Sequence, residues 1–199
     1  MCHECARIGW DDVGLGVACL KMIGFRGKGK REVMAHLLEI ETFPIVLNAR
    51  GEWSHGGKPL HPRVEKLFRE SVRVNADGSY RIELGRNQSD IEVADVAFFV
   101  TSLELALDER GELQRVELTL SDGSREALNP STLMQSSDNV FYCAIERDSF
   151  LVPCRLERAP YHELALFTEI QEEGPVLRMS GGAFGISSFE RAPKRLSGA

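Results

Sequence analysis

Apolar and polar residues alternate along most of the chain from residue 43 onward, which is the pattern of strands with one buried face. The apolar run 43–48 predicts a first buried strand. Two alternating arms flank Asp77-Gly78, and two more flank Asp122-Gly123. Glycine in that place supplies the positive φ of a tight turn. The pattern therefore predicts a series of antiparallel hairpins.

The spacing of apolar residues changes to that of a helix in a few segments. Residues 61–71 carry Val64, Leu67 and Phe68 at i, i+3 and i+4, with Pro62 in the first turn. A second helix is expected over 160–170 and a short one over 31–40. The predicted fold class is α+β, with antiparallel hairpins and small curved sheets accompanied by two or three helices.

The segment 140–157, "VFYCAIERDSFLVPCRLE", predicts two strands joined by a two-residue turn at 148–149. This register places Cys143 opposite Cys154, and it turns the missing N–H of Pro153 away from the partner strand. Cβ atoms of such a hydrogen-bonded pair lie about 5.5 Å apart, whereas a disulfide prefers roughly 3.8 Å. We expect two adjacent buried thiols, with a redox switch as the alternative.

The chain divides by composition into four segments. Residues 1–40 are rich in glycine and form an N-terminal appendage, 41–96 and 97–190 form two blocks of sheet and helix, and 191–199 form a tail. "ARGEW…NADGSY" in the first block is echoed by "ERGELQ…LSDGSR" in the second. Internal duplication explains this echo, and shared turn chemistry explains it equally well.

Composition narrows the classes of function. The chain has 199 residues, of which 43% are hydrophobic and 27% charged, and its formal net charge is -6. This charge argues against a partner that is a nucleic-acid polymer, since such binding depends on many lysines and arginines. No apolar stretch approaches the roughly 20 residues of a membrane span. A cytoplasmic location is expected, where cysteines are free thiols or ligands by default.

A glycine-rich segment near the N-terminus has part of the spacing of a phosphate-binding loop. Gly24, Gly29 and Lys30 match, but Arg31 replaces the Ser or Thr that holds magnesium. That loop also belongs between a parallel strand and its helix, whereas the predicted sheets are antiparallel. The segment does not predict a nucleotide hydrolase.

Few other residues suggest metal binding or catalysis. Cys2-x-x-Cys5, with Cys19 further along, is half of a zinc site and leaves a thiol or zinc sensor as an alternative function. Asp90, Glu92 and Asp95 are interpreted as solvated ends of a strand. We find no catalytic set, and we expect no cofactor and no metal.

Cationic and turn residues carry the remaining ligand-like chemistry. Arginines flank two predicted helix starts, where backbone N–H groups favour anions, a tyrosine there can stack on a base, and "SGG" can form a backbone nest. The candidate ligand-binding residues are Arg63, Arg155, Arg158, Tyr161, Ser180 and Gly181.

Several segments resemble an uncharacterised bacterial family, the domain of unknown function numbered twelve eighty-five. They are "RGEW…GKPL…VEKLF", "NADGSYRIEL", "IEVADVAFFV" and "FLVPCRLERAPYHELA" with "SGGAF". The resemblance covers 43–186, and His61 and Pro62 depart from the basic stretch expected there. It implies a duplicated core, a C-terminal half similar to pleckstrin-homology folds, a cleft between the halves for a nucleotide-like ligand, and a role in signal transduction.

The leading hypothesis is a non-enzymatic cytoplasmic regulatory protein that binds a small anionic, nucleotide-like ligand between its two blocks. The first alternative is a protein–protein interaction module with a protein partner and no small ligand. The second is the thiol or zinc sensor.

Overall fold

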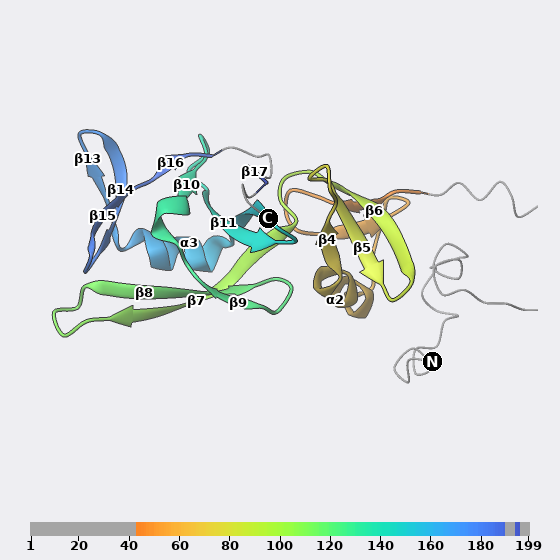
Figure 1. Cartoon of the computed structure of the whole chain (residues 1–199), viewed down its shortest axis with the longest axis horizontal. Coiled ribbons are helices and arrows are strands. Elements are labelled where there is room, and N and C mark those ends of the chain that lie inside the picture. Colours follow the sequence, from red (N-terminus) through yellow and green to blue (C-terminus); the bar gives the residue numbers. More distant parts are fainter. Residues whose placement is uncertain (1–42, 190–193, 196–199) are drawn as a thin grey trace, which may run out of the picture.

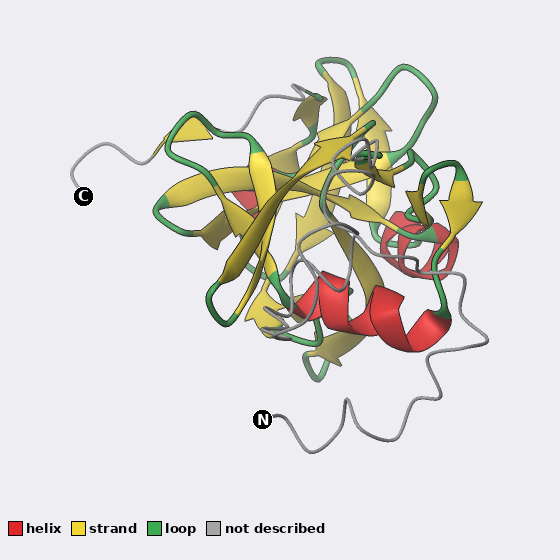
Figure 2. Cartoon of the chain, turned by 90° about the vertical axis from the view of Figure 1, so that its right-hand side faces the viewer, coloured by secondary structure: helices red, strands yellow, loops and turns green. Residues whose placement is uncertain are grey.

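The computed structural model describes residues 43–189 and 194–195. The expected helix over 31–40, the glycine-rich segment at 24–30 and the cysteines at 2, 5 and 19 lie outside the described residues. Strands dominate the described chain, with two α-helices among them (Figure 2). Neither helix is long and apolar enough to cross a bilayer.

The first sheet has six strands in the order β3-β2-β1-β6-β5-β4, with β1 and β6 parallel at its centre. Its strands are β1 (Ile45–Leu47), β2 (Trp53–His55), β3 (Lys58–Pro59), β4 (Val72–Val74), β5 (Tyr80–Leu84) and β6 (Asn87–Val93). Alternate residues of the β4–β5 hairpin, such as Val72, Val74 and Ile82, are buried. The predicted first strand and the predicted hairpin are both confirmed.

Helix α2 (Pro62–Glu70) lies against the first sheet near the ends of β4 and β5, and it begins at the predicted proline (Figure 1). The His61 side chain caps it by accepting a hydrogen bond from the backbone N–H of Arg63, at 3.3 Å. Phe68 is buried and packs its ring against Trp53, with centroids 5.8 Å apart. Arg69 donates to the carbonyl of Gly51 at 2.8 Å. The helix is thereby tied to the turn after β1.

The second sheet lies beside the first and has eight strands, with the main order β16-β10-β11-β12-β7-β8-β9 and with β17 against β12 (Figure 1). Its elements are β7 (Phe98–Leu107), β8 (Leu113–Leu120), β9 (Arg125–Ala127), the 3-10 helix η3 (Pro130–Thr132), β10 (Met134–Gln135), β11 (Phe141–Arg147), β12 (Phe150–Leu156), β16 (Ser187–Ser188) and β17 (Lys194–Arg195). Residues 96–100, which include the start of β7, are buried. The start of β7 is central in the sheet, between β12 and β8.

Helix α3 (Arg158–Ala165) is followed by a third sheet, made of β13 (Thr168–Gln171), β14 (Gly174–Met179) and β15 (Gly182–Gly185). Leu164 is fully buried, and the half-buried Tyr161 packs against the core, as the helical spacing predicts. The predicted end of this helix at 170 is wrong. Thr168 closes the helix with a side-chain bond to the Ala165 carbonyl, and pairing with β14 then holds the following residues in a strand.

The segments whose sequences echo one another form turns with the same side-chain hydrogen bonds. Asn48 Oδ1 accepts from the backbone N–H groups two and four residues ahead, and Asp108 Oδ1 does the same. Asp77 and Asp122 each accept from the N–H and the hydroxyl of the serine two residues ahead. Between the paired turns lie β2, β3, α2 and β4 in the first block but only β8 in the second. The matched letters therefore share their turn chemistry, while the elements between the paired turns differ.

The β11–β12 hairpin has the predicted register. Asp148 and Ser149 have φ of 49° and 67°, as a two-residue hairpin turn requires, and Cys143 faces Cys154. Both cysteines are free and fully buried. Burial, together with the bond to Cys143, raises the pKa of the Cys154 thiol well above its ordinary value. The thiol is therefore protonated and a weak nucleophile at neutral pH.

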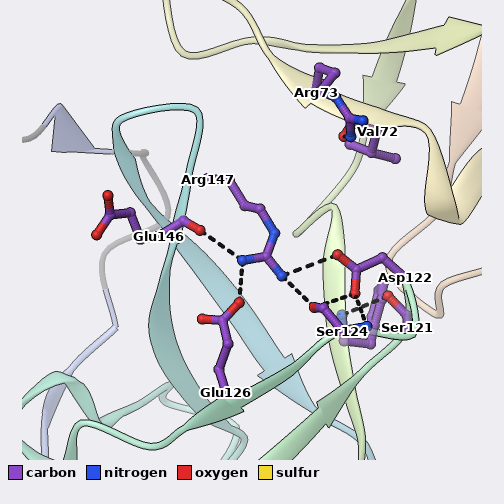
Figure 3. Close-up of polar contacts among 9 residues, drawn as sticks. Val72, Arg73, Ser121, Asp122, Ser124, Glu126, Glu146 and Arg147 are labelled. Carbon is purple, nitrogen blue, oxygen red and sulfur yellow. Dashed lines mark hydrogen bonds and ion pairs between the residues drawn. The ribbon is translucent and has the colours of Figure 1, made fainter.

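Arg147 ties the hairpin to the β8–β9 turn (Figure 3). Its Nη2 donates to Asp122 Oδ2 at 3.1 Å and to Ser124 Oγ at 2.6 Å, and its Nη1 donates to Glu126. The guanidinium carbon lies 5.2 Å from the ring centroid of Phe98. Arg147 therefore uses both of its terminal nitrogens in structural contacts.

The two sheets meet along a seam that combines ring packing and backbone bonding. The ring of Phe98, from β7, packs edge-on against Tyr80 of β5 at 6.4 Å. Asp148 Oδ2 accepts from the backbone N–H of Val74 at 2.8 Å. One cluster of buried apolar side chains runs through both sheets. The seam brings the β1–β2 turn next to the ends of β11 and β12.

Candidate functional site

A polar junction lies at the seam, where the chain passes from β6 to β7. Asp95 Oδ2 accepts from the Tyr142 hydroxyl at 3.0 Å and from Arg155 Nη1 at 3.3 Å. Tyr142 and Arg155 face each other on β11 and β12. The side chain of Asp95 is only 5% exposed, so its interpretation as a solvated strand end is wrong. Asp95 is buried because the connection from β6 to β7 packs between the two sheets.

Arg155 also reaches the first sheet. Its Nη1 donates to the carbonyl of Ala49 at 2.7 Å, which fixes the β1–β2 turn against β12. Gly51 completes this turn with φ of 81°, and a Cβ atom there would lie 3.2 Å from the Phe99 ring. Both the backbone conformation and the close approach require glycine. The turn therefore presents its exposed residues beside the second sheet.

A cavity of about 520 Å³ lies between this turn and the start of α3. Three arginines from three different elements line it, and Glu157 is the one acidic residue in the lining. The lining residues are Ala49, Arg50, Phe99, Asn139, Val140, Arg155, Leu156, Glu157, Arg158, Tyr161 and His162. The excess of guanidinium groups favours an anion. Hereafter this is the arginine cavity.

A second cavity, of about 750 Å³, adjoins the first and shares Ala49, Val140 and Arg155 with it. It is lined by the β10–β11 turn, by β16 and by residues of the polar junction. The lining residues are Ala49, Asp95, Gln135, Ser136, Ser137, Asp138, Val140, Tyr142, Arg155, Pro175, Ile186, Ser187, Ser188 and Phe189. Hereafter this is the hydroxyl cavity. The ring of Phe189 stacks on Tyr142 with centroids 3.6 Å apart.

Three of the six predicted ligand residues come together. Arg155, Arg158 and Tyr161 all line the arginine cavity, because β12 leads directly into α3. Arg158 is exposed, and Tyr161 is half-buried with its ring tilted against Phe141 at 4.8 Å. Two guanidinium groups and an aromatic ring thus face one space.

The other three predicted residues lie outside the linings of both cavities. Arg63 is exposed in the first turn of α2, on the first sheet. Ser180 and Gly181 form the turn between β14 and β15, where the Ser180 N–H donates to the Leu113 carbonyl at 2.8 Å. That backbone donor is occupied, so the turn has fewer N–H groups for an anion than the sequence suggested.

Sequence reasoning missed Arg50, Asn139 and His162. Arg50 stands in "ARGEW", which was interpreted only as a turn around its glycine. Asn139 has φ of 58° and occupies the left-handed position of the β10–β11 turn, a role that asparagine tolerates. His162 follows Tyr161 on α3. The sequence did place a cation, Arg50, in a predicted turn. It lines a cavity only because the β1–β2 turn packs against the second sheet.

The charged groups are divided between the cavities. In residues 43–189, Arg50 and Arg158 form no ion pair, while Arg155 is shared with Asp95. The hydroxyl cavity holds the carboxylates of Asp95 and Asp138. Within the described residues no cluster of three or more His, Cys, Asp or Glu suits a metal ion. The arrangement can bind an anion on one side and neutral polar groups on the other.

Comparisons with known proteins identify the fold. No family model matches the chain, and no curated protein matches its sequence. A DUF1285 family protein from Silicibacter pomeroyi DSS-3 superposes with a TM-score of 0.57 at 18% identity, covering 84% of this chain and 93% of that one. A DUF1285 family protein from Shewanella baltica OS155 gives 0.49 at 20% identity, covering 62% and 91%. The first likeness confirms the predicted resemblance at the level of the fold.

Proposed function

We propose that this protein is a non-enzymatic regulatory protein that binds a small anionic, nucleotide-like ligand in the arginine cavity, between the blocks 41–96 and 97–190. One observation carries the proposal. Arg50 of the first sheet and Arg155 and Arg158 of the second sheet line the same cavity. Cations from separate elements repel one another, so placing them around one cavity is unfavourable unless an anion is bound between them.

The chemistry of the lining supports a phosphate-like group. Guanidinium groups bind phosphate through two parallel N–H donors, and helix α3 starts at Arg158 with a Glu157 cap that makes no side-chain hydrogen bond. The volume of about 520 Å³ falls within the usual range of small-molecule sites. Tyr161 supplies an aromatic ring for a base.

The position of the cavity supports a regulatory role. An anion held by both Arg50 and Arg158 joins the two blocks, so its binding changes the free energy of their association. Signal transduction, a cytoplasmic location, duplication of the core and a pleckstrin-homology likeness of the second block remain parts of this proposal. A curled sheet with one helix against β7 supports that last likeness.

A protein–protein interaction module is the second candidate. Leu166 and Ile170, near the end of α3 and on β13, are 82% and 84% exposed. Large apolar side chains this exposed are common at protein interfaces. A protein partner on this surface is compatible with a ligand in the arginine cavity, because the two sets of residues do not overlap.

The test compares two exposed arginines. Binding of inorganic phosphate, pyrophosphate and adenosine monophosphate is measured by calorimetry and thermal shift for the full chain, for Arg158→Ala and for Arg63→Ala. We expect Arg158→Ala to weaken binding about tenfold or more, corresponding to roughly 1.4 kcal/mol, because one charge-assisted contact is lost. Arg63→Ala removes the same charge away from the cavity and should leave binding unchanged.

Two results would contradict the proposal. One is the absence of binding for all three anions, and the other is an equal loss in the two variants, which would indicate a general effect of net charge. The double variant Arg50→Ala and Arg158→Ala tests the connection between the sheets. It should weaken binding more than either single change.

A further inference from the structure

We propose that the hydroxyl cavity holds the uncharged, polyhydroxylated part of the same ligand, so that the ligand class is a phosphate ester of a sugar or polyol. This inference rests on the proposed function, since it takes the anionic end of the ligand to lie in the arginine cavity. It adds where the hydroxyl-bearing part of the ligand lies, while Tyr161 in the arginine cavity is left for a base when the ligand carries one.

The lining of the hydroxyl cavity is suited to alcohols. Four serines line it, from the β10–β11 turn and from β16, together with the amide of Gln135. Ser137, Ser187 and Ser188 are exposed, and no hydroxyl of these three is used in a hydrogen bond within residues 43–189. A hydroxyl both donates and accepts, so a row of serines matches the alternating donors and acceptors of a polyol.

The charges orient the ligand. The hydroxyl cavity is lined by two carboxylates, of Asp95 and the exposed Asp138, and by Arg155, which pairs with Asp95. The arginine cavity is lined by three guanidinium groups and one carboxylate. A phosphate beside Asp138 would be repelled, but an alcohol donates readily to a carboxylate. The anion therefore belongs in the arginine cavity and the alcohol groups in the other.

Continuity lets one molecule occupy both spaces. Ala49, Val140 and Arg155 line both cavities, so a ligand bound by Arg155 extends from one to the other along the same wall. Ile186 and Phe189 add apolar surface to the hydroxyl cavity, against which the carbon skeleton of a sugar can pack. Each of the two volumes is large enough for one part of such a ligand.

The experiment uses four probes and two matched variants. Affinities for inorganic phosphate, glycerol 3-phosphate, glucose 6-phosphate and free glucose are measured by calorimetry on the full chain. Ser187→Val removes a hydroxyl from the cavity on strand β16, and valine suits a strand. Ser102→Val makes the same change on an exposed residue of β7 that lines neither cavity.

We expect glucose 6-phosphate to bind at least tenfold more tightly than inorganic phosphate. Ser187→Val should reduce the affinity for glucose 6-phosphate several-fold and leave inorganic phosphate unchanged, and Ser102→Val should change neither. Ser137→Ala gives an independent loss if the strand substitution disturbs folding. Equal affinities for phosphate and the two phosphate esters would overturn the inference and leave the proposed function standing.

The two proposals fail in different ways. If neither phosphate nor any ester binds, the proposed function is wrong and the inference falls with it. If free glucose binds as tightly as its phosphate, the anion site is overturned, and the assignment of one spanning ligand with it.

Discussion

Two arginines of the second sheet, Arg147 and Arg155, lie only eight positions apart but differ in what surrounds them. Arg147 uses both terminal nitrogens on Asp122, Ser124 and Glu126. It also covers the Phe98 ring, and its side chain is 19% exposed. Within the described residues, Arg155 donates through Nη1 alone, to Asp95 and Ala49, and it is 30% exposed at two cavities.

The contrast separates a structural cation from a candidate binding cation. A guanidinium group has five donors in a fixed fork. When protein acceptors use most of them, as around Arg147, the group holds elements together. When one nitrogen positions the side chain and the residue also lines a cavity, as for Arg155, the group is preorganised for a ligand.

The largest effect is expected for Arg147→Ala. The substitution leaves the carboxylates of Asp122 and Glu126 without their shared cation, and Asp122 is only 15% exposed. We expect a loss of about 3 kcal/mol in the free energy of unfolding, because partly buried carboxylates lose charge-assisted bonds. Urea denaturation at neutral pH measures it.

The pH dependence checks the cause of that loss. Partial burial pushes the pKa of Asp122 upward, but its bonds to Ser124 and the nearby Arg147 outweigh this and leave the pKa lowered from 3.8. The ion pair thus stabilises the fold above pH 3.8, and this stability is lost as the pH falls through the lowered pKa. The difference between wild type and Arg147→Ala should narrow at low pH. A constant difference would assign the effect to packing on Phe98.

Tyr80 packs against Phe98, the ring that Arg147 covers, and its pKa tests how well this part of the seam is buried. Burial raises the pKa of its phenol to about 12, with a smaller effect from Cys154. The neutral phenol stabilises the fold fully below pH 10, and the contribution is lost as the pH rises from 10 through 12, up to about 2.7 kcal/mol. Tyr80→Phe should remove this part of the alkaline loss of stability, as followed by denaturation at pH 9 and pH 11. Identical alkaline profiles would contradict the burial of the phenol.

Arg155→Ala should cost less stability than Arg147→Ala. One carboxylate, Asp95, loses a cation, and it still accepts from the Tyr142 hydroxyl. We expect a loss of about 1.5 kcal/mol by urea denaturation. A loss equal to or greater than that of Arg147→Ala would reverse the comparison and make Arg155 the main connection between the sheets.

The smallest effect is expected for the bond between the hairpin turn and the first sheet. Asp148→Gly removes the acceptor for the Val74 N–H while keeping a residue that tolerates φ of 49°. The expected loss is about 1 kcal/mol, the net worth of one hydrogen bond. Asp148→Asn keeps an acceptor oxygen and serves as the control. Equal losses in the two variants would show that the charge matters, not the bond.

Local elements could be predicted wherever neighbours in sequence decide them. Helix α2 begins at Pro62, the hairpins turn at their glycines, and Cys143 faces Cys154, because each depends on turn chemistry and alternation over a few residues. The end of α3 could not be predicted in this way. Residues 168–171 keep helical spacing, but their pairing with β14 decides their conformation.

The same distinction holds for the candidate site. Arg155, Arg158 and Tyr161 were predictable as a group because one strand and the helix after it carry all three. Arg50 was not, since a residue more than a hundred positions earlier joins them only where the β1–β2 turn docks on β12. Asp95 was predicted at a solvated strand end, yet it is buried at the junction, because distant segments of both sheets pack around it.

By itself, the sequence determined the fold class, the hairpin turns, the register of the β11–β12 pair and three of the residues that line the arginine cavity. Only the tertiary structure decided that Arg147 is bonded to protein acceptors whereas Arg155 lines a cavity. It also decided where α3 ends and that Asp95 is buried. The physical reason is range: alternation and turn geometry act over a few residues, whereas burial and charge pairing depend on segments that fold together from distant parts of the chain.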